Sequence, residues 1–509
     1  MSVAWLAVPA FLLLVVLYDL TQTRHAILRN FPIVGHFRYW LEAVGPELRQ
    51  YIVTNNDEER PFSRDQRRWV YASAKRQNNY FGFGTDNELE HSPGYLVIKQ
   101  STFPLEEPHK GYADYDDEHN VPCGKILGGA RGRAKAFRPK SVVNIGAMSY
   151  GSLSARAVEA INRGCAIGNG LHNTGEGGVS DHHRHGGDLI WQLGTGYFGA
   201  RNEDGTFSLD KLKECVERTP SIRGIEVKLS QGAKPGRGGV LPAAKITEEI
   251  SRIRGIPRGK DCISPPGHSA FSDVDSLLDF VESIADATGL PVGIKSAVGH
   301  EQFWDDLADE MAKGERGVDW IAIDGGEGGT GAAPLVFSDH VSLPFKVGFT
   351  RVYSKFAARG ITDKVVWIGS GRLGFPAEML LAMALGCDMI YVAREAMMAI
   401  GCIQAQKCHS GHCPTGVATQ NKWLVRGLDP TDKGARMANY LITLRKELMW
   451  LTRACAQPHP SMVDLSHFEL LDDRFGGDSA REVFGYQDAW GPRGPEVTDD
   501  LLVAIGKKG

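Results

Sequence analysis

The distribution of apolar residues between positions 142 and 395 restricts the fold of this chain more than any other feature. Short apolar runs recur there, and helix-like or loop sequence separates most of them. Runs that are apolar on both faces are typical of parallel strands buried inside an α/β protein. The eight runs lie at residues 142–149, 170–175, 188–196, 222–230, 291–297, 320–326, 365–371 and 389–395.

Eight strand–helix repeats predict a (β/α)8 or TIM barrel, and a doubly wound open sheet is the alternative. Nearly every run ends in glycine or polar residues, and in a barrel these ends share the face on which active sites are built. The seventh and eighth ends commonly bind a phosphate through backbone N–H groups and helix N-termini. We therefore expect a phosphorylated cofactor such as FMN at Ser370, Gly371, Arg372, Ala393 and Arg394.

The composition is that of an ordinary globular protein. Charged residues make up 23% and hydrophobic residues 42% of the 509 positions, which excludes a disordered chain. The 57 basic and 61 acidic residues leave a net charge of −4, so the chain has no bulk positive field for a nucleic-acid partner. The 60 glycines indicate many close approaches of backbone to a ligand or sharp turns.

The N-terminal residues 3–17 form an uncharged apolar run. The run is slightly shorter than the roughly 17–25 residues of a membrane span, and Asp19 interrupts its continuation. Arginines follow at positions 24, 29 and 38, which predicts a single-pass anchor in the cell membrane with the catalytic body in the cytoplasm. A buried or interfacial helix and a cleaved signal peptide are the alternatives, although no basic residue precedes the run.

The predicted organisation has four parts. They are a transmembrane anchor (1–22), a juxtamembrane segment (23–85), the barrel with a cysteine-rich loop (86–424) and a C-terminal helical extension (425–509). The second part is basic and aromatic, and we interpret it as helices packed on the main domain, with a lipid headgroup patch as the alternative. A cytoplasmic body predicts that the cysteines are thiols or metal ligands.

Three cysteines give the sharpest local signal. Cys402, Cys408 and Cys413 follow a C-x5-C-x4-C spacing, with a proline directly after the last. Closely spaced thiolates can hold an iron–sulfur cluster, and three protein sulfurs suit a three-iron cluster. A zinc site completed by neighbouring histidines and plain buried thiols are the alternatives, although the spacing matches no common zinc pattern.

Two further segments carry candidate catalytic groups. Lys228 lies inside an apolar run and Lys234 in the loop after it. A lysine at the edge of a flavin can stabilise the anionic reduced ring, and one facing a substrate can bind a carboxylate; two surface lysines are the alternative. Glu176 follows the second run, where a carboxylate could handle protons or an amino group. The histidines at 182, 183 and 185 look like metal ligands but are more typical of a polar loop.

Taken in order, these motifs resemble the FMN-binding synthase domain of glutamate synthases over residues 140–422. The matching segments are GAMSYGSLS (146–154), NTGEGG (173–178), VKLSQGAKPGRGGVLP (227–242), ISPPGH (263–268), GIKS (293–296), GGEGGTGAAPL (325–335) and the cysteine loop running into CPTGVATQ. The resemblance implies a (β/α)8 barrel that holds FMN and a 3Fe–4S cluster. It also implies an oxidoreductase of the CH–NH2 class that aminates 2-oxoglutarate to L-glutamate through an imine.

The resemblance further implies residue roles. The cluster ligands are Cys402, Cys408 and Cys413, and the catalytic residues are Glu176, Lys228 and Lys234. The residues expected to bind 2-oxoglutarate are Gln231, Lys234 and Arg254, the last because a guanidinium grips carboxylates bidentately. The residues expected to bind FMN are Met148, Ser149, Lys228, Lys295, Gly328, Gly329, Thr330, Ser370, Gly371, Arg372, Ala393 and Arg394.

The chain departs from the family pattern at two positions. The family segment KPGEGGQLP reads KPGRGGVLP here, so Arg237 reverses a charge and Val240 removes an amide. We expect neither a glutaminase nor a nucleotide-binding domain, so ammonia is free or comes from a separate glutaminase. Electrons come from a ferredoxin-like protein or an NAD(P)H-oxidising subunit. The alternatives are a membrane-associated oxidoreductase for another 2-oxo acid or imine, and an electron-transfer subunit without amination.

Overall fold

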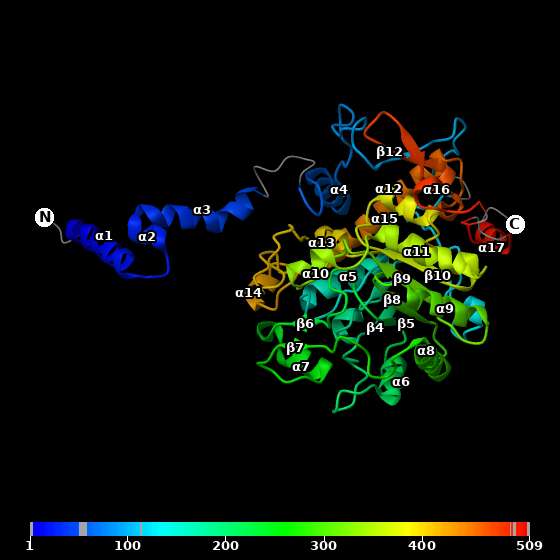
Figure 1. Cartoon of the computed structure of the whole chain (residues 1–509), viewed down its shortest axis with the longest axis horizontal. Coiled ribbons are helices and arrows are strands. Elements are labelled where there is room, and N and C mark those ends of the chain that lie inside the picture. The colour runs from blue at the N-terminus through cyan, green and yellow to red at the C-terminus, as the bar shows by residue number, and fades with distance from the viewer. Residues whose placement is uncertain (1–3, 50–58, 112–114, 489, 492–494, 506–509) are drawn as a thin grey trace. The chain divides into compact units, whose positions relative to one another are not determined.

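The computed structural model describes residues 4–49, 59–111, 115–488, 490–491 and 495–505 (Figure 1). The chain forms two compact units, Met1–Arg67 and Arg68–Gly509. The predicted part boundaries after residues 22, 85 and 424 stay predictions.

The N-terminal unit is built from three helices, α1 (Ala4–Thr21), α2 (Ala26–Asn30) and α3 (Val34–Leu48). Asp19 near the end of α1 is fully buried. Its carboxylate accepts the backbone N–H of Ile33 at 2.9 Å and lies 2.8 Å from Nε2 of His36. This one side chain therefore ties the end of α1 to the start of α3.

No helix in the described part of the chain is long and apolar enough to cross a membrane. The 18 residues of α1 extend about 27 Å at 1.5 Å per residue, less than the roughly 30 Å hydrocarbon core. The predicted single-pass anchor over residues 1–22 is therefore not supported. Residues 1–3 of that prediction lie outside the described residues.

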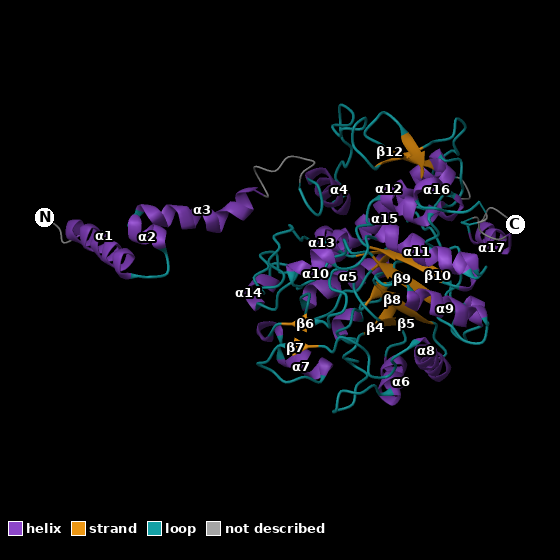
Figure 2. Cartoon of the chain, in the orientation of Figure 1, coloured by secondary structure: helices purple, strands orange, loops and turns teal. Residues whose placement is uncertain are grey.

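The larger unit contains a closed barrel of eight parallel strands, which Figure 2 shows surrounded by helices. All eight predicted strands are confirmed, and they are buried along almost their whole length. The alternative of an open sheet is wrong, because the hydrogen-bonded order closes on itself. The order is β10 (Val366–Ser370), β11 (Met389–Val392), β2 (Val143–Ile145), β3 (His172–Asn173), β4 (Leu189–Leu193), β5 (Ile222–Lys228), β8 (Val292–Ser296) and β9 (Trp320–Asp324).

Helices connect most successive strands. They are α5 (Ala155–Ile167), α6 (Leu209–Arg218), α8 (Val274–Thr288), α9 (Gln302–Ala312), α11 (Phe345–Ala358) and α12 (Pro376–Ala384). Side-chain caps fix where several begin: Ser154 accepts the N–H of Ala157 at α5, and Asp273 accepts that of Ser276 at α8. Between β3 and β4 the described chain forms only a short 3₁₀ turn, Asp181–His183.

The long helix α15 (Pro430–Ala454) packs along α5 beside the barrel. Close contact is possible because Gly164 of α5 carries no side chain: a Cβ there would lie 2.3 Å from Cβ of Met437. Shorter elements complete the unit. They are α4 (Arg64–Ala74), β1 (Tyr95–Ile98), β6 (Val240–Leu241), α7 (Glu248–Arg254), β7 (Cys262–Ile263), α10 (Leu335–His340), α13 (Arg394–Ala399), α14 (Lys422–Val425), β12 (Phe468–Leu471), β13 (Gly477–Ser479), α16 (Ala480–Val483) and α17 (Pro495–Ala504).

A buried carboxylate lies among the barrel strands. Glu226 of β5 is completely buried, and its two oxygens accept four hydrogen bonds. The donors come from four other strands: Asn173 and Gln192 at 2.7 Å, and Trp320 and Tyr391 at 3.2 Å. Because all four hydrogen bonds converge on one carboxylate, Glu226 fixes the relative positions of the side chains inside the barrel.

Candidate functional site

An ion pair lies at the carboxyl ends of the barrel strands. Nζ of Lys228, the last residue of β5, is 3.0 Å from Oε1 of Glu176, which follows β3. The same ammonium donates to Oε1 of Gln231 at 3.1 Å, and Gln231 donates to the carbonyl of Gly329 at 2.8 Å. The barrel thus brings together four of the residues that the sequence analysis selected.

The surroundings of Glu176 keep its side chain ionised. Burial opposes ionisation, but the cations Lys228, Lys234 and Arg254 outweigh it and lower the pKa of Glu176 to about 2. Two glycines leave the space that the carboxylate occupies. A Cβ at Gly194 would lie 2.6 Å from Oε2, and one at Gly239 would lie 2.5 Å from Oε1.

Two more cations lie close to this carboxylate. Lys234 is buried and donates to the carbonyl of Ala332 at 3.4 Å, and burial together with Lys228 lowers its pKa to about 8. Arg254, at the end of α7, donates to the carbonyl of Tyr150 at 3.0 Å and lies over the ring of Phe198. Its buried Nε has no hydrogen-bond partner in the described residues.

Asp324, the last residue of β9, organises the adjacent strand ends. Its Oδ1 accepts the hydroxyl of Ser370 at 2.7 Å and lies 3.6 Å from Nζ of Lys295, while its Oδ2 accepts the N–H of Gly232 at 2.8 Å. Ser370 and Lys295 are predicted from the sequence to lie at a cofactor, whereas Asp324 is not. Its position at the end of an apolar run was the available signal.

The ends of β10 and β11 carry two cations. Arg394, the first residue of α13, donates to the carbonyl of Glu327, and a Cβ at Gly329 would lie 2.5 Å from its Cδ. Arg372 lies near enough to Glu327 and Arg394 to influence the pKa of each. Gly371 has a φ of +124°, which lets the backbone between the strand end and Arg372 turn sharply.

The segment after β2 packs on the Glu176 loop. Met148 is buried; its N–H donates to the carbonyl of Asn173, and its carbonyl lies 3.1 Å from Nε2 of His183. A Cβ at Gly175 would lie 2.8 Å from the backbone nitrogen of Ser149. Gly328, Thr330 and Ala393 lie in the loops after β9 and β11, as predicted from their sequence positions.

The cysteine loop follows α13. Cys402, Cys408 and Cys413 are free thiols, and the three influence one another's ionisation. Burial raises the pKa of Cys402 to about 12. Burial also opposes ionisation of Cys413, but hydrogen bonds from Ala418 and Thr415 outweigh it and lower the pKa of that thiol.

A buried lysine joins this loop to the barrel. Nζ of Lys245 donates to the carbonyl of Cys408 at 2.7 Å and to that of Ser152 at 3.3 Å. Lys245 is not predicted from the sequence, because nothing in the surrounding segment distinguishes it from a surface lysine.

The three histidines after Glu176 have separate partners. His182 lies 3.1 Å from Glu249 and His185 lies 3.9 Å from Glu159, whereas buried His183 contacts Ser180 and Met148. Within the described residues, no group of three or more His, Cys, Asp or Glu side chains could hold a single metal ion.

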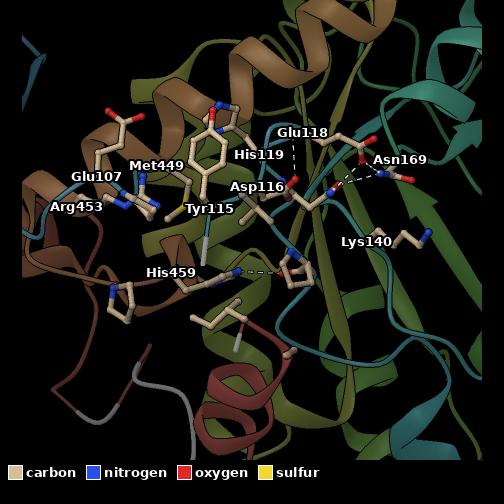
Figure 3. Close-up of a pocket in the computed structure, with 17 residues that line it drawn as sticks. Glu107, Tyr115, Asp116, Glu118, His119, Lys140, Asn169, Met449, Arg453 and His459 are labelled. Carbon is tan, nitrogen blue, oxygen red and sulfur yellow. Dashed lines mark hydrogen bonds between the residues drawn. The ribbon is translucent and has the colours of Figure 1, made fainter. Parts of the chain in front are cut away.

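A cavity of about 490 Å³ lies away from these strand ends (Figure 3). Lys140 and Asn169 line it, and they precede β2 and β3, so it belongs to the amino-terminal side of the barrel. Its acidic groups are already bonded: Asp116 accepts the N–H groups of Glu118 and Asn120, and Glu118 accepts the amide of Asn169. We assign no chemistry to this cavity.

The family model described as "Conserved region in glutamate synthase" matches residues 128–457. The chain belongs to the glutamate synthase family. It is an oxidoreductase of the glutamate synthase type, as the relatives' names and the barrel indicate. The matched region contains every predicted site residue, from Met148 to Cys413.

The matches between this chain and its relatives cover different fractions of each relative's length. "Glutamate synthase large subunit-like protein YerD" of Bacillus subtilis is 38% identical over 88% of this chain and 90% of its own. "Archaeal-type glutamate synthase [NADPH]" of Thermotoga neapolitana is 37% identical over 68% of this chain and 63% of its own. A solved structure of mandelate oxidase is 13% identical, with a TM-score of 0.40 over 71% of this chain and 83% of its own, too distant to support an argument.

Proposed function

We propose that this enzyme reductively aminates 2-oxoglutarate to L-glutamate with ammonia that is free or supplied by a separate glutaminase. The observation that carries the proposal is the group formed by ionised Glu176 and the cations Lys228, Lys234 and Arg254. This group can therefore bind negatively charged and positively charged parts of a substrate close to each other. A substrate with two carboxylates and an incoming ammonium or iminium nitrogen requires that combination.

The residues fit FMN at the adjoining strand ends. Arg372 and Arg394 follow β10 and β11, where barrels bind phosphate, and Gly371 lets the backbone turn there. Lys228 and Lys295 are paired across the neighbouring strands β5 and β8, where they would lie along the edge of a flavin and favour its anionic form. When bound, FMN supplies the hydride that reduces an imine to an amine.

The cysteine loop fits a 3Fe–4S cluster. Each thiolate binds a different iron in such a cluster, so the three sulfurs need not converge on one ion. The hydrogen bonds that favour the thiolate of Cys413 suit a ligand sulfur. Such a cluster carries single electrons, and we propose a ferredoxin-like protein or an NAD(P)H-oxidising subunit as their source.

We assign the cationic side chains to the substrate carboxylates and the anionic side chain to the nitrogen. Lys234 and Arg254 bind and orient the substrate carboxylates, and Gln231 positions the loop that ends at Lys234 through its bond to Gly329. Glu176 stays ionised, so it attracts the ammonium nitrogen and the positive charge of the iminium. Lys228 holds that carboxylate in place through the 3.0 Å contact.

A different 2-oxo acid is the second candidate substrate, and one observation favours it. Gly239, whose α-carbon adjoins the Glu176 carboxylate, is followed directly by Val240 in β6. The position that departs from the family pattern is therefore next in sequence to a glycine of the candidate substrate site. The guanidinium of Arg237 lies over the ring of Phe337, 5.7 Å from its centroid.

The test is an anaerobic absorbance trace of the reduced flavoprotein during addition of 2-oxoglutarate and ammonium. Prompt reoxidation with formation of L-glutamate is the expected result. If the flavin stays reduced with 2-oxoglutarate but reoxidises with another 2-oxo acid, the second candidate replaces the first. If it stays reduced with every 2-oxo acid, the amination proposal is wrong and the chain serves electron transfer.

A further inference from the structure

We propose that α1, α2 and α3 bind the surface of an anionic lipid bilayer. In this arrangement α1 lies among the acyl chains, and Arg24, Arg29 of α2 and Arg38 of α3 lie among the headgroups. The proposal concerns attachment to one side of a bilayer, and it is independent of the proposed amination.

The exposed surface of α1 is apolar in every direction. Leu6 is 74% exposed, Val8 62%, Phe11 64%, Leu12 41%, Leu13 60% and Leu14 65%. Successive helix positions differ by about 100°, so these side chains project all round the helix rather than along one stripe. A protein groove covers one face of a helix, whereas acyl chains can surround it.

Aromatic side chains continue this surface beyond α1. Phe31, Phe37 and Trp40 are each more than half exposed. The rings of Phe37 and Trp40 stack on one side of α3, with centroids 5.8 Å apart. Aromatic rings of this kind concentrate at the level of lipid headgroups.

The charges of the same segment complement an anionic surface. Between residues 4 and 41 the only acidic residue is Asp19, which is buried against Ile33 and His36. Arginines at positions 24, 29 and 38 are exposed, and the last is 3.8 Å from Glu42 in an exposed pair. Residues 4–41 therefore present cations and apolar side chains and bury their one carboxylate.

The geometry around Asp19 also keeps the unit folded back on itself. Ile33, whose N–H binds that carboxylate, has a φ of 63°, which is rare for a β-branched residue. The bond to Asp19 stabilises this turn, which brings the arginine-bearing segment next to the apolar helix.

The experiment is flotation of the full-length protein with vesicles of phosphatidylcholine, with and without phosphatidylglycerol. We expect the protein to float with the anionic vesicles. Replacing Arg24, Arg29 and Arg38 together by Gln lowers partitioning on the order of a hundredfold, about fivefold for each lost cation. The triple variant Lys213→Gln, Arg218→Gln, Lys364→Gln removes the same charge from the larger unit and keeps wild-type flotation.

A second pair of variants tests the apolar part. Leu13→Asp with Leu14→Asp abolishes flotation, and circular dichroism equal to wild type shows that the barrel is folded. The proposal is overturned if wild type fails to float with anionic vesicles, or if the arginine variant floats like wild type. It is also overturned if the double aspartate variant turns a dimer into a monomer but leaves flotation unchanged, because a second copy then covers this surface.

Discussion

At the residue scale, the candidate site depends on charges of opposite sign that the barrel holds in a buried place. Glu176 would be protonated easily in an apolar pocket, yet three cations lower its pKa to about 2. For Lys234 the surroundings favour the neutral form instead, since burial and Lys228 lower its pKa to about 8. The two groups therefore differ in how they respond to pH near neutrality.

The first prediction concerns the pH dependence of substrate binding. The proposed binding of a substrate carboxylate needs the ammonium form of Lys234, and the fraction of that form falls as the pH rises through about 8. The KM for the 2-oxo acid should therefore rise above that pH, whereas Glu176 stays ionised and adds no pH dependence. Initial rates measured from pH 6.5 to 9.5 check this. Lys234→Arg, which stays protonated, should show no such rise in KM.

The second prediction is the loss of that cation altogether. Lys234→Ala should raise the KM for the 2-oxo acid about ten- to hundredfold, because a hydrogen bond to a charged group is worth about 1.5–3 kcal/mol. The flavin absorbance per chain should stay at the wild-type value, since Lys234 touches no predicted phosphate-binding residue. An unchanged KM would remove Lys234 from the substrate site.

At the element scale, loops from distant parts of the sequence are fastened by single buried groups. Lys245 follows β6 and binds carbonyls of both the cysteine loop and the loop after β2. Glu226 does the same for strands, because its carboxylate accepts from β3, β4, β9 and β11. Removal of either group leaves buried polar partners unsatisfied.

The third prediction is that Lys245→Met weakens retention of the proposed 3Fe–4S cluster. Methionine keeps most of the apolar stem but loses both hydrogen bonds, so the cysteine loop is held less firmly. Supports of this kind change metal affinity about 10–100-fold, and iron per chain after gel filtration should fall accordingly. Lys260→Met, at an exposed lysine, is the control. Equal iron in both variants would show that the loop needs no such support.

The fourth prediction concerns the interior of the barrel. Glu226→Ala should lower the free energy of unfolding by about 3 kcal/mol or more, because four buried donors lose their acceptor. Urea denaturation measures the change. Glu226→Gln keeps one acceptor oxygen and should be less destabilising than Glu226→Ala; the reverse order would contradict this account.

At the scale of the whole molecule, α15 completes the larger unit by packing along α5. Arg445 of α15 is fully buried and donates to the carbonyls of Glu118, His119 and Gly168. The helix therefore contacts both the first barrel helix and the segment that precedes the barrel. Its docking is a property of the tertiary structure rather than of either helix alone.

The fifth prediction tests this docking through a glycine. Gly164→Ala should destabilise the protein by about 1–3 kcal/mol, although alanine favours a helix, because the added Cβ would lie 2.3 Å from Met437. Gly299→Ala, in the loop after β8, is a control for the added methyl group, since no atom lies within 4 Å of its added Cβ. Thermal unfolding of both variants decides the matter, and similar melting temperatures would show that α15 adapts without cost.

The sequence by itself determined the barrel. Eight apolar runs end in polar residues. Because a strand buried on both faces needs a continuous apolar run, each strand could be predicted from its own segment of the sequence. The same logic placed Glu176, Lys228 and Ser370 at strand ends. The glutamate synthase resemblance rested on motifs in a fixed order, which the match over residues 128–457 confirmed as a family relation.

Only the tertiary structure decided which groups meet. Asp324, Lys245 and Glu226 gain their roles from partners far away in the sequence, and no local pattern records a contact between separate strands and loops. The same reason explains the N-terminal helix: a run of apolar residues predicts burial in lipid or protein, but the end of α1 is fixed by Asp19 binding residues 33 and 36. Local composition indicates whether a segment has apolar surface to bury, whereas the fold determines which residues or lipids cover that surface.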